Sequence, residues 1–259
     1  MISKEELLEI AKLMGLRPWQ QEKHYLQHLA LDIMAEEPLV FKGGTYLWFS
    51  HGLDRFSEDL DFTASENLTH NIAERVSRGL GLFGVENAIK PIKDNEAAVS
   101  FRISAKGPLN TAKIDECVIY VEISKRERIL EKPLPIKLDY PAYSLPIKTI
   151  PGMALEEVAA EKVRAIFTRK KARDMHDLNY LVTKKGVRFD KGMVNSKLRY
   201  YRFEFSTDLF LKNISAMRGY YSRELKSLVF GELPRFDDVK GNLADWVSDK
   251  GSDNLPRAH

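Results

Sequence analysis

Two aspartates near the start of the chain stand at a spacing that could hold a metal ion. They occur in Asp59-Leu60-Asp61-Phe62, where the side-chain period of two in a strand puts both carboxylates on one face and turns Leu60 and Phe62 toward a core. Two carboxylates this close repel each other unless a cation lies between them, and oxygen ligands suit Mg²⁺ or Mn²⁺. The pair therefore predicts a divalent-metal site. The alternative is an ordinary strand face in contact with solvent.

A glycine turn lies just before these acids. Lys42-Gly43-Gly44-Thr45 is followed by the apolar run Tyr46-Leu47-Trp48-Phe49, which is typical of a helix start. Adjacent glycines let the backbone approach a ligand closely or adopt positive φ, and a helix that opens after them directs free N–H groups at an anion. The pattern predicts a cradle for phosphate groups, assisted by Lys42 or Ser57. A plain turn is the alternative.

These motifs are more specific in combination than any of them is alone. The chain carries four of them in order: Lys42-Gly-Gly-Thr45, Arg55-Phe-Ser-Glu-Asp-Leu-Asp-Phe62, Glu161-Lys162 and Arg173-Asp-x-x-Asp177-Leu178. This order resembles the AbiEii-type nucleotidyltransferase toxin family within the polymerase-β-like nucleotidyltransferases. The resemblance implies transfer of a nucleoside monophosphate from a nucleoside triphosphate to a hydroxyl, with release of pyrophosphate. It also implies the toxin of a toxin–antitoxin pair, with transfer RNA ends as acceptor and a separately encoded antitoxin as partner.

The residues near the acids have distinct expected roles in that reaction. Gly43, Gly44 and Thr45 would hold the β and γ phosphates. Asp59 and Asp61 would bind the metal, Mg²⁺ or Mn²⁺, that orients the α phosphate.

A third acid is expected on a neighbouring strand. In the predicted strand Cys117 to Ser124, Ile119, Val121 and Ile123 form an apolar row, so Glu122 projects from the opposite face. Glu122 would bind metal and position or deprotonate the acceptor hydroxyl. The alternative is a surface glutamate paired with Arg126 or Arg128. The family usually has a lysine two residues before this acid, where this chain has Tyr120, and the substitution puts a phosphate contact in doubt.

The roles of two later residues come from the resemblance. It implies that Lys162 contacts the nucleotide phosphates and neutralises charge on the leaving pyrophosphate, and that Asp177 closes the site. Six basic residues and no acidic one lie between Lys162 and Arg173, which alone would indicate a solvated face. Asp174 is expected to pair locally, with Arg169 or Arg173.

A second basic region lies further along the chain. Residues 188–226 hold nine Lys or Arg and four Asp or Glu, interleaved with aromatic residues. This mixture suits a surface that stacks on bases and contacts RNA phosphates. It equally suits a helical bundle whose aromatic residues form the core and whose charges are solvated.

Composition and pattern indicate an α/β (α+β) fold. The 259 residues are 44% hydrophobic and 30% charged, with a net charge of +3 that is too small to indicate nucleic-acid binding by itself. Strands are expected at 39–41, 59–62, 85–92, 97–104, 117–124 and 136–140, and helices from Met153 onward. We therefore predict a mixed-sheet catalytic domain with flanking helices over residues 1–150 and a helical domain over 151–259, with the site in the cleft between them. No run approaches the ~20 apolar residues of a membrane span and no signal segment is evident, which favours a cytoplasmic protein without membrane partners.

Two histidines also stand at metal-ligand spacing. His24 and His28 are four residues apart on a predicted helix. Because neither a third ligand nor a zincin glutamate accompanies them, we expect partly exposed histidines and no metal.

Two other functions are compatible with the sequence. The same residues could nucleotidylate or phosphorylate a protein, or the catalytic parts could have decayed to leave a module that binds RNA or protein. Intact Asp59 and Asp61 argue against decay, whereas Tyr120 is compatible with it. The nucleotide, the acceptor, the antitoxin and the oligomeric state are not indicated by the sequence.

Overall fold

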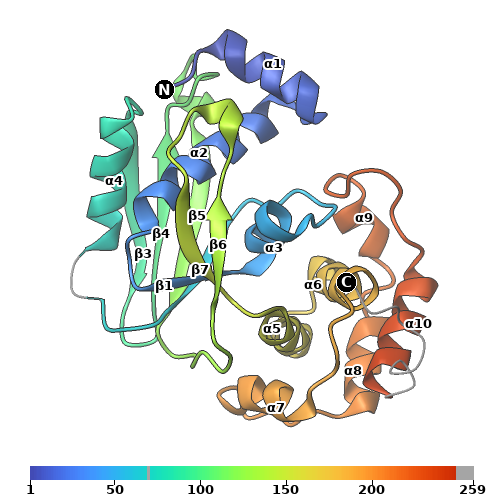
Figure 1. Cartoon of the computed structure of the whole chain (residues 1–259). Coiled ribbons are helices and arrows are strands. Elements are labelled where there is room, and N and C mark those ends of the chain that lie inside the picture. Colours follow the sequence, from blue (N-terminus) through green and yellow to red (C-terminus); the bar gives the residue numbers. More distant parts are fainter. Residues whose placement is uncertain (69–70, 249–259) are drawn as a thin grey trace. The chain divides into compact units, whose positions relative to one another are not determined.

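The computed structural model describes residues 1–68 and 71–248 and is shown in Figure 1. The chain divides into two compact units. The first comprises Met1–His51, Ser57–Ile129 and Pro133–Gly152. The second comprises Gly52–Phe56, Leu130–Lys132 and the described part of Met153–His259.

A mixed seven-stranded sheet forms the centre of the first unit, within the described residues. The spatial order of its strands is β3, β4, β5, β2, β1, β7 and β6. The strands β2 and β5 pair in parallel, as do β1 and β7, and the other neighbours are antiparallel. The strands are β1 (Leu39–Lys42), β2 (Leu60–Ala64), β3 (Asn87–Asp94), β4 (Ala98–Ala105), β5 (Cys117–Ser124), β6 (Leu134–Leu138) and β7 (Lys148–Gly152). This sheet, with helices before it and a largely helical region after it, confirms the predicted fold class.

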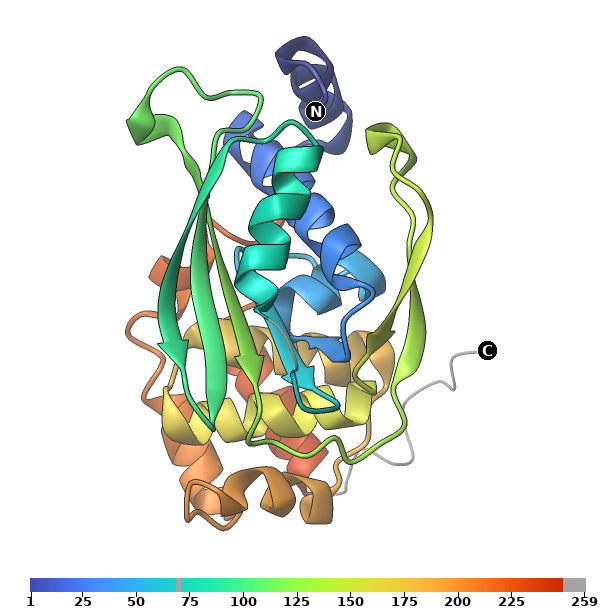
Figure 2. The same cartoon turned by 90° about the vertical axis from the view of Figure 1, so that its left-hand side faces the viewer.

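Helices cover one face of this sheet. In Figure 2, α2 (Pro18–Met34) and α4 (Ile72–Leu82) lie on the same face, and α4 packs on β3 and α2 on β5. The covered face is apolar because alternate residues of the strands point into it, among them the buried Phe101 and Val121. Each large side chain buried there stabilises the fold by about 1.5–3 kcal/mol.

Capping residues mark the ends of the first two helices. The helix α1 (Lys4–Met14) begins with a capping box in which the Ser3 side chain accepts from the Glu6 backbone N–H and the Glu6 side chain accepts from the Ser3 backbone N–H. It ends at Gly15, whose φ of +65° is the left-handed conformation that glycine favours. Pro18 is the first residue of α2, where its missing N–H costs no hydrogen bond.

The expectation of partly exposed histidines on α2 was wrong. His24 and His28 are 5% and 8% exposed. His24 Nδ1 lies 2.6 Å from the Tyr143 hydroxyl oxygen, and the His28 ring stacks on Phe49. Burial lowers the pKa of His28 to about 4, so the ring is neutral at pH 7. The aromatic residues that enclose both rings are distant in sequence, which is why helical spacing alone did not reveal the burial.

The sequence pattern missed one strand. The strand β7 lies in the proline-rich passage between the predicted sheet region and the helices, and Pro151 is one of its residues. Proline lacks the N–H that a strand donates and so argues against a central strand. Here Pro151 is the register partner of Pro135 on β6, and β7 meets β1 at the single pair Phe41 and Gly152.

The second unit is helical. Its described helices are α5 (Leu155–Thr168), α6 (Ala172–Lys185), α7 (Lys191–Arg199), α8 (Thr207–Ser215), α9 (Tyr221–Leu225) and α10 (Phe236–Val247). The helix α5 packs against α6, α7 and α8, and α10 packs against α6 and α8. Val163 and Ile166 of α5 are fully buried.

The aromatic residues of the second basic region divide between core and surface. Phe205 and Tyr221 are buried, in line with the helical-bundle alternative. Tyr200 and Phe203 are 58% and 42% exposed, beside the end of α7. Neither alternative therefore describes the whole region.

Of the helices that the structure describes, none has both the length and the apolar character that a bilayer crossing requires.

Candidate active site

The start of α3 (Gly43–His51) lies directly against Asp61. Gly43 has a φ of +80°, and a Cβ at this position would overlap the Asp61 carboxylate. Only glycine allows this approach. The helix begins at Gly43 itself and not after the glycines, so Gly43 and Gly44 belong to its first turn. The N–H groups of a first turn lack acceptors within the helix and carry a partial positive charge. The predicted phosphate cradle therefore adjoins the predicted metal ligand.

The side chain of Thr45 fixes the segment that carries the first acid. Thr45 is fully buried, and its Oγ1 donates to the Asp59 carbonyl oxygen at 2.5 Å. This bond uses the Thr45 hydroxyl hydrogen, so that hydrogen is not available to a phosphate. Thr45 can still offer its backbone N–H to an anion, while its side chain joins α3 to the residue just before β2.

Strand register brings the acids together. Asp61 on β2 is the register partner of Glu122 on β5, and Asp59 directly precedes β2. Leu60 and Phe62 are fully buried, so the predicted alternation at β2 is confirmed. Ile119, Val121 and Ile123 are likewise buried, which places Glu122 on the predicted face. The side chains of Asp61 and Glu122 therefore lie on one face of adjacent strands.

These acids suit a metal whose coordination a substrate completes. Within the described residues, no three His, Cys, Asp or Glu side chains are grouped closely enough to enclose an ion. Mg²⁺ commonly takes one or two protein carboxylates and completes its octahedron with water and substrate phosphates. The paired acids Asp61 and Glu122, next to an anion cradle, fit that mode of binding, whereas Asp59 lies just outside β2 and has no register partner.

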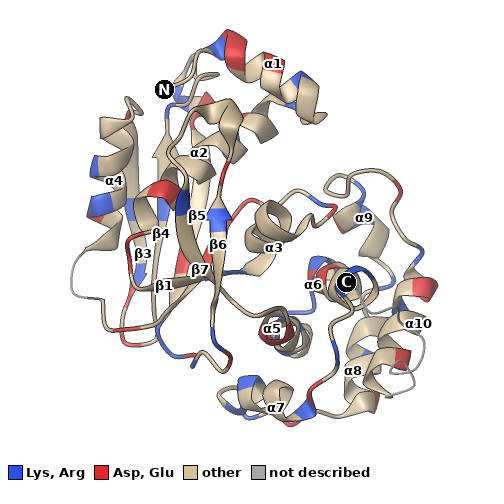
Figure 3. Ribbon diagram, in the orientation of Figure 1, with Lys and Arg blue, Asp and Glu red and all other residues tan. Residues whose placement is uncertain are grey.

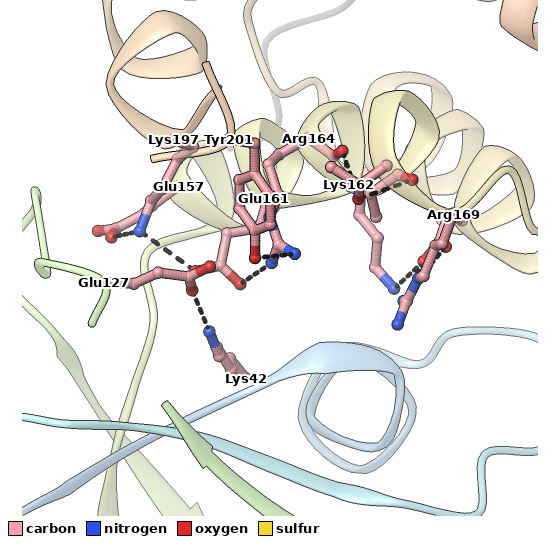
Figure 4. Close-up of polar contacts among 12 residues, drawn as sticks. Lys42, Glu127, Glu157, Glu161, Lys162, Arg164, Arg169, Lys197 and Tyr201 are labelled. Atoms are coloured by element: carbon pink, nitrogen blue, oxygen red, sulfur yellow. Dashed lines mark hydrogen bonds and ion pairs between the residues drawn. The ribbon is translucent and has the colours of Figure 1, made fainter. Parts of the chain in front are cut away.

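Lys42 is held by an acid that the sequence motifs did not include. Its Nζ lies 2.8 Å from Glu127 Oε2, and both side chains are largely buried (Figure 4). Lys42 is also the register partner of Asp61. Glu127 follows β5 in the charged run Arg126-Glu127-Arg128, whose arginines were the alternative partners for Glu122. In this geometry Lys42 neutralises Glu127 beside the acid pair.

Ser57, which was expected like Lys42 to assist phosphate binding, is 8% exposed. Its carbonyl oxygen accepts from the Gln27 side chain at 3.3 Å.

A second cluster of charges lies inside the helical unit. Lys162 of α5 is 6% exposed, and its Nζ lies 3.2 Å from Asp174 Oδ1 and 2.5 Å from Asp177 Oδ2 on α6. The Arg169 Nε lies 2.8 Å from Asp174 Oδ2 (Figure 4). The predicted local pair of Asp174 with Arg169 is confirmed, and Lys162 joins it.

Asp177 also makes a bidentate pair with Arg55. The Arg55 Nε and Nη2 each donate to one Asp177 oxygen at 2.6 Å, and both residues are buried. Parallel bonds of this kind hold guanidinium and carboxylate in one plane. Arg55 belongs to one of the four sequence motifs, but its type and position there predicted no role. Asp177 is fully buried, and its ion pairs hold Arg55 and Lys162 in position.

The surrounding cations keep both aspartates ionised. Burial alone would raise the pKa of Asp177, but the charges of Arg55 and Lys162 outweigh burial and hold the pKa well below its usual range. Burial would also raise the pKa of Asp174. The charges of Lys162 and Arg169 outweigh burial there too, and the pKa of Asp174 is lowered. The cluster thus carries three cationic and two anionic side chains.

Comparisons with known proteins agree with the fold described above. Residues 25–242 match the family model described as "Nucleotidyl transferase AbiEii toxin, Type IV TA system". The fold is similar to that of MenT4, a nucleotidyltransferase toxin from Mycobacterium tuberculosis, with 20% identity, a TM-score of 0.63 and coverage of 99% of this chain and 91% of that one. It is also similar to JHP933 from Helicobacter pylori, with 21% identity, a TM-score of 0.57 and coverage of 88% and 90%. No curated protein matches the chain.

Proposed function

The chain belongs to the AbiEii nucleotidyltransferase toxin family of type IV toxin–antitoxin systems, and we propose that it transfers a nucleoside monophosphate to the 3′ hydroxyl of an RNA, with transfer RNA ends as acceptor. The family implies a nucleoside triphosphate substrate and an antitoxin partner. One observation carries the proposal. Gly43, at the start of α3, lies directly against Asp61, and Asp61 is the register partner of Glu122. This arrangement places an anion cradle beside oxygen ligands, as phosphoryl-group chemistry requires.

In this proposal, the sheet unit holds the triphosphate and the acceptor hydroxyl. The N–H groups of Gly43, Gly44 and Thr45 bind β and γ phosphate oxygens, and Lys42 and Ser57 support this turn. Asp59, Asp61 and Glu122 hold Mg²⁺ or Mn²⁺, which supplies charge neutralisation at the phosphates. Glu122 also accepts or orients the proton of the attacking hydroxyl, which improves alignment for in-line transfer.

The helical unit supplies positive charge. An ammonium group has three donors, and Asp174 and Asp177 occupy two directions around Lys162. We assign its remaining donor to a phosphate oxygen whose charge grows as pyrophosphate leaves. Asp177 serves this step by fixing the position of the ammonium group.

The acceptor class is tested by following the label. The protein is incubated with each α-³²P-labelled triphosphate, Mg²⁺ and either total RNA or protein extract. Label on RNA supports the proposal. Label on protein would replace it with protein nucleotidylation. In a parallel incubation with γ-³²P-labelled triphosphate, label on protein would indicate a kinase. Absence of transfer with every triphosphate and acceptor would favour a decayed binding module.

Alanine at Gly43 is expected to damage both stability and transfer. The new Cβ must adopt a positive φ and displace the Asp61 carboxylate. Strain of this kind costs about 1–3 kcal/mol, so urea unfolding should show a loss of that size and labelled transfer should fall with it. The matched control is Gly81→Ala on α4, where a Cβ meets nothing within 4 Å and φ is not positive. Equal stability and transfer for Gly43→Ala and wild type would contradict the close approach.

The end of α7 offers a second test of RNA as acceptor. Arg199 and Arg202 are exposed beside Tyr200. Changing both arginines to glutamate should weaken RNA binding and leave triphosphate binding unchanged. The slope of log K against log salt should fall by about 0.7–0.9 for each phosphate that the variant no longer neutralises, as measured by filter binding. The same affinity and slope in variant and wild type would assign this segment to packing alone.

A further inference from the structure

We propose that the face of the sheet opposite α2 and α4 binds the single-stranded end of the acceptor RNA, with Tyr120 stacking on a base and Arg102 and Lys90 contacting phosphates. This inference rests on the proposed function, because it assumes an RNA acceptor. It assigns the acceptor a surface on β3, β4 and β5, outside the residues that hold the triphosphate.

Tyr120 stands on this face beside the proposed catalytic acid. It is two residues before Glu122 on β5, so its Cα lies about 7 Å from that of Glu122 along the strand. Its side chain is 47% exposed, whereas its apolar neighbours Ile119 and Val121 point into the core and are buried. A single exposed aromatic side chain is common on protein surfaces, and Tyr120 differs from such a residue in the charged side chains around it.

Basic residues continue from Tyr120 across the strands. Arg102 on β4 is the register partner of Tyr120, and Lys90 on β3 is the register partner of Arg102. The Cα of Tyr120 is therefore one strand spacing from that of Arg102 and two from that of Lys90, about 5 and 10 Å. A second row of register partners crosses the same strands at Glu122. Ser100 on β4 is the partner of Glu122, and the exposed Lys93 on β3 is the partner of Ser100. Figure 3 shows the Lys and Arg of β3 and β4 in blue.

The guanidinium of Arg102 has an unused donor. Its Nε is buried and has no hydrogen-bond partner in the part of the chain that the structure describes. Because this Nε is closed to solvent, a phosphate from a bound strand would meet the terminal nitrogens of the guanidinium and not Nε itself. Within the described residues, Arg102, Lys90 and Lys93 also form no ion pair. A phosphate oxygen is an acceptor of the right charge for all three.

The combination favours single-stranded RNA over a protein segment. Bases of a single strand expose their faces and stack on aromatic rings, whereas bases in a duplex do not. A ring next to these three cations offers both contacts that a nucleotide makes, to base and to phosphate. The acids of this face, Asp61 and Glu122, lie at its edge toward the cradle, where the proposed metal offsets their charge.

The test uses the full chain and a labelled single-stranded RNA oligonucleotide of mixed sequence, with its duplex as competitor. Tyr120→Ala should weaken binding about five- to a hundredfold, and Tyr120→Phe, which keeps the ring, should bind within about twofold of wild type. Arg102→Ala should lower the slope of log K against log salt by about 0.7. The matched control is Arg78→Ala, an exposed arginine on α4, with wild-type affinity expected.

Transfer kinetics separate this inference from the proposed function. Tyr120→Ala should raise KM for RNA and leave KM for the triphosphate unchanged. Suppose that wild type labels RNA, and that Tyr120→Ala and Arg102→Ala match it in RNA affinity, salt slope and KM for RNA. This result would overturn the acceptor surface and leave the proposed function standing. Label on protein, or no RNA binding by wild type, would overturn both. Should Tyr120→Ala unfold, Tyr120→Phe and Arg102→Ala decide the outcome.

Discussion

Asparagine at position 61 is expected to lower nucleotide transfer at least about a hundredfold. A charged ligand of the metal stabilises developing charge by several kcal/mol, and each 1.36 kcal/mol corresponds to a tenfold change in rate. Asp61 is the acid against which Gly43 packs and the register partner of Glu122, so no neighbouring group can take its place without moving the strand or the helix. The measurement is the initial rate of label transfer at saturating triphosphate and Mg²⁺.

Stability should respond differently from activity. Removing one of two adjacent negative charges relieves repulsion in the metal-free protein, so the free energy of unfolding should change little. Asp139→Asn is the control, because Asp139 forms a surface pair with Lys137. Near wild-type transfer by Asp61→Asn would remove this residue from the metal site. A large loss of stability would instead make it a structural residue.

Local patterns in the sequence predicted those parts of the site that a single strand or turn defines. Alternation alone placed Leu60 and Phe62 in the core and Glu122 opposite an apolar row, because side-chain direction in a strand follows residue number. The glycine pair indicated the anion cradle in the same way. The contact of Gly43 with Asp61 could not be predicted, because it depends on how α3 packs on β2.

Ion pairs between residues that are distant in the sequence could not be predicted from local patterns. Lys42 and Glu127 are 85 residues apart, and Arg55 and Asp177 are 122 apart. Each of these residues could also have been a solvated surface charge, the usual state of Lys, Arg, Asp and Glu. The prediction for the two α2 histidines failed for the same reason, because their burial depends on Tyr143, more than a hundred residues away. Strand β7 was missed because its prolines obscure the pattern of a strand.

Removing the guanidinium of Arg55 is expected to cost about 3–5 kcal/mol of unfolding free energy. Arg55 and Asp177 are both buried, and removal of one partner leaves the other charge only partly compensated, here by Lys162. Arg55→Ala should therefore unfold at much lower urea concentration than wild type. The comparison variant is Arg235→Ala, because Arg235 forms an exposed pair with Asp238 in the same unit, and its removal should shift the urea midpoint far less than Arg55→Ala does.

The pH dependence of stability identifies the carboxylate in this pair. Because the pKa of Asp177 is depressed in the folded state, its contribution to stability is complete above the unfolded pKa of about 3.9 and is lost as pH falls toward the folded pKa. Asp177→Asn should be less stable than wild type at pH 6, and the difference should narrow as pH falls below about 4. A constant difference from pH 6 to pH 3 would mean that the ionised carboxylate is not what stabilises the helical unit. If instead Asp177→Asn kept wild-type stability at pH 6 and no longer supported transfer, Asp177 would serve the reaction and not the fold.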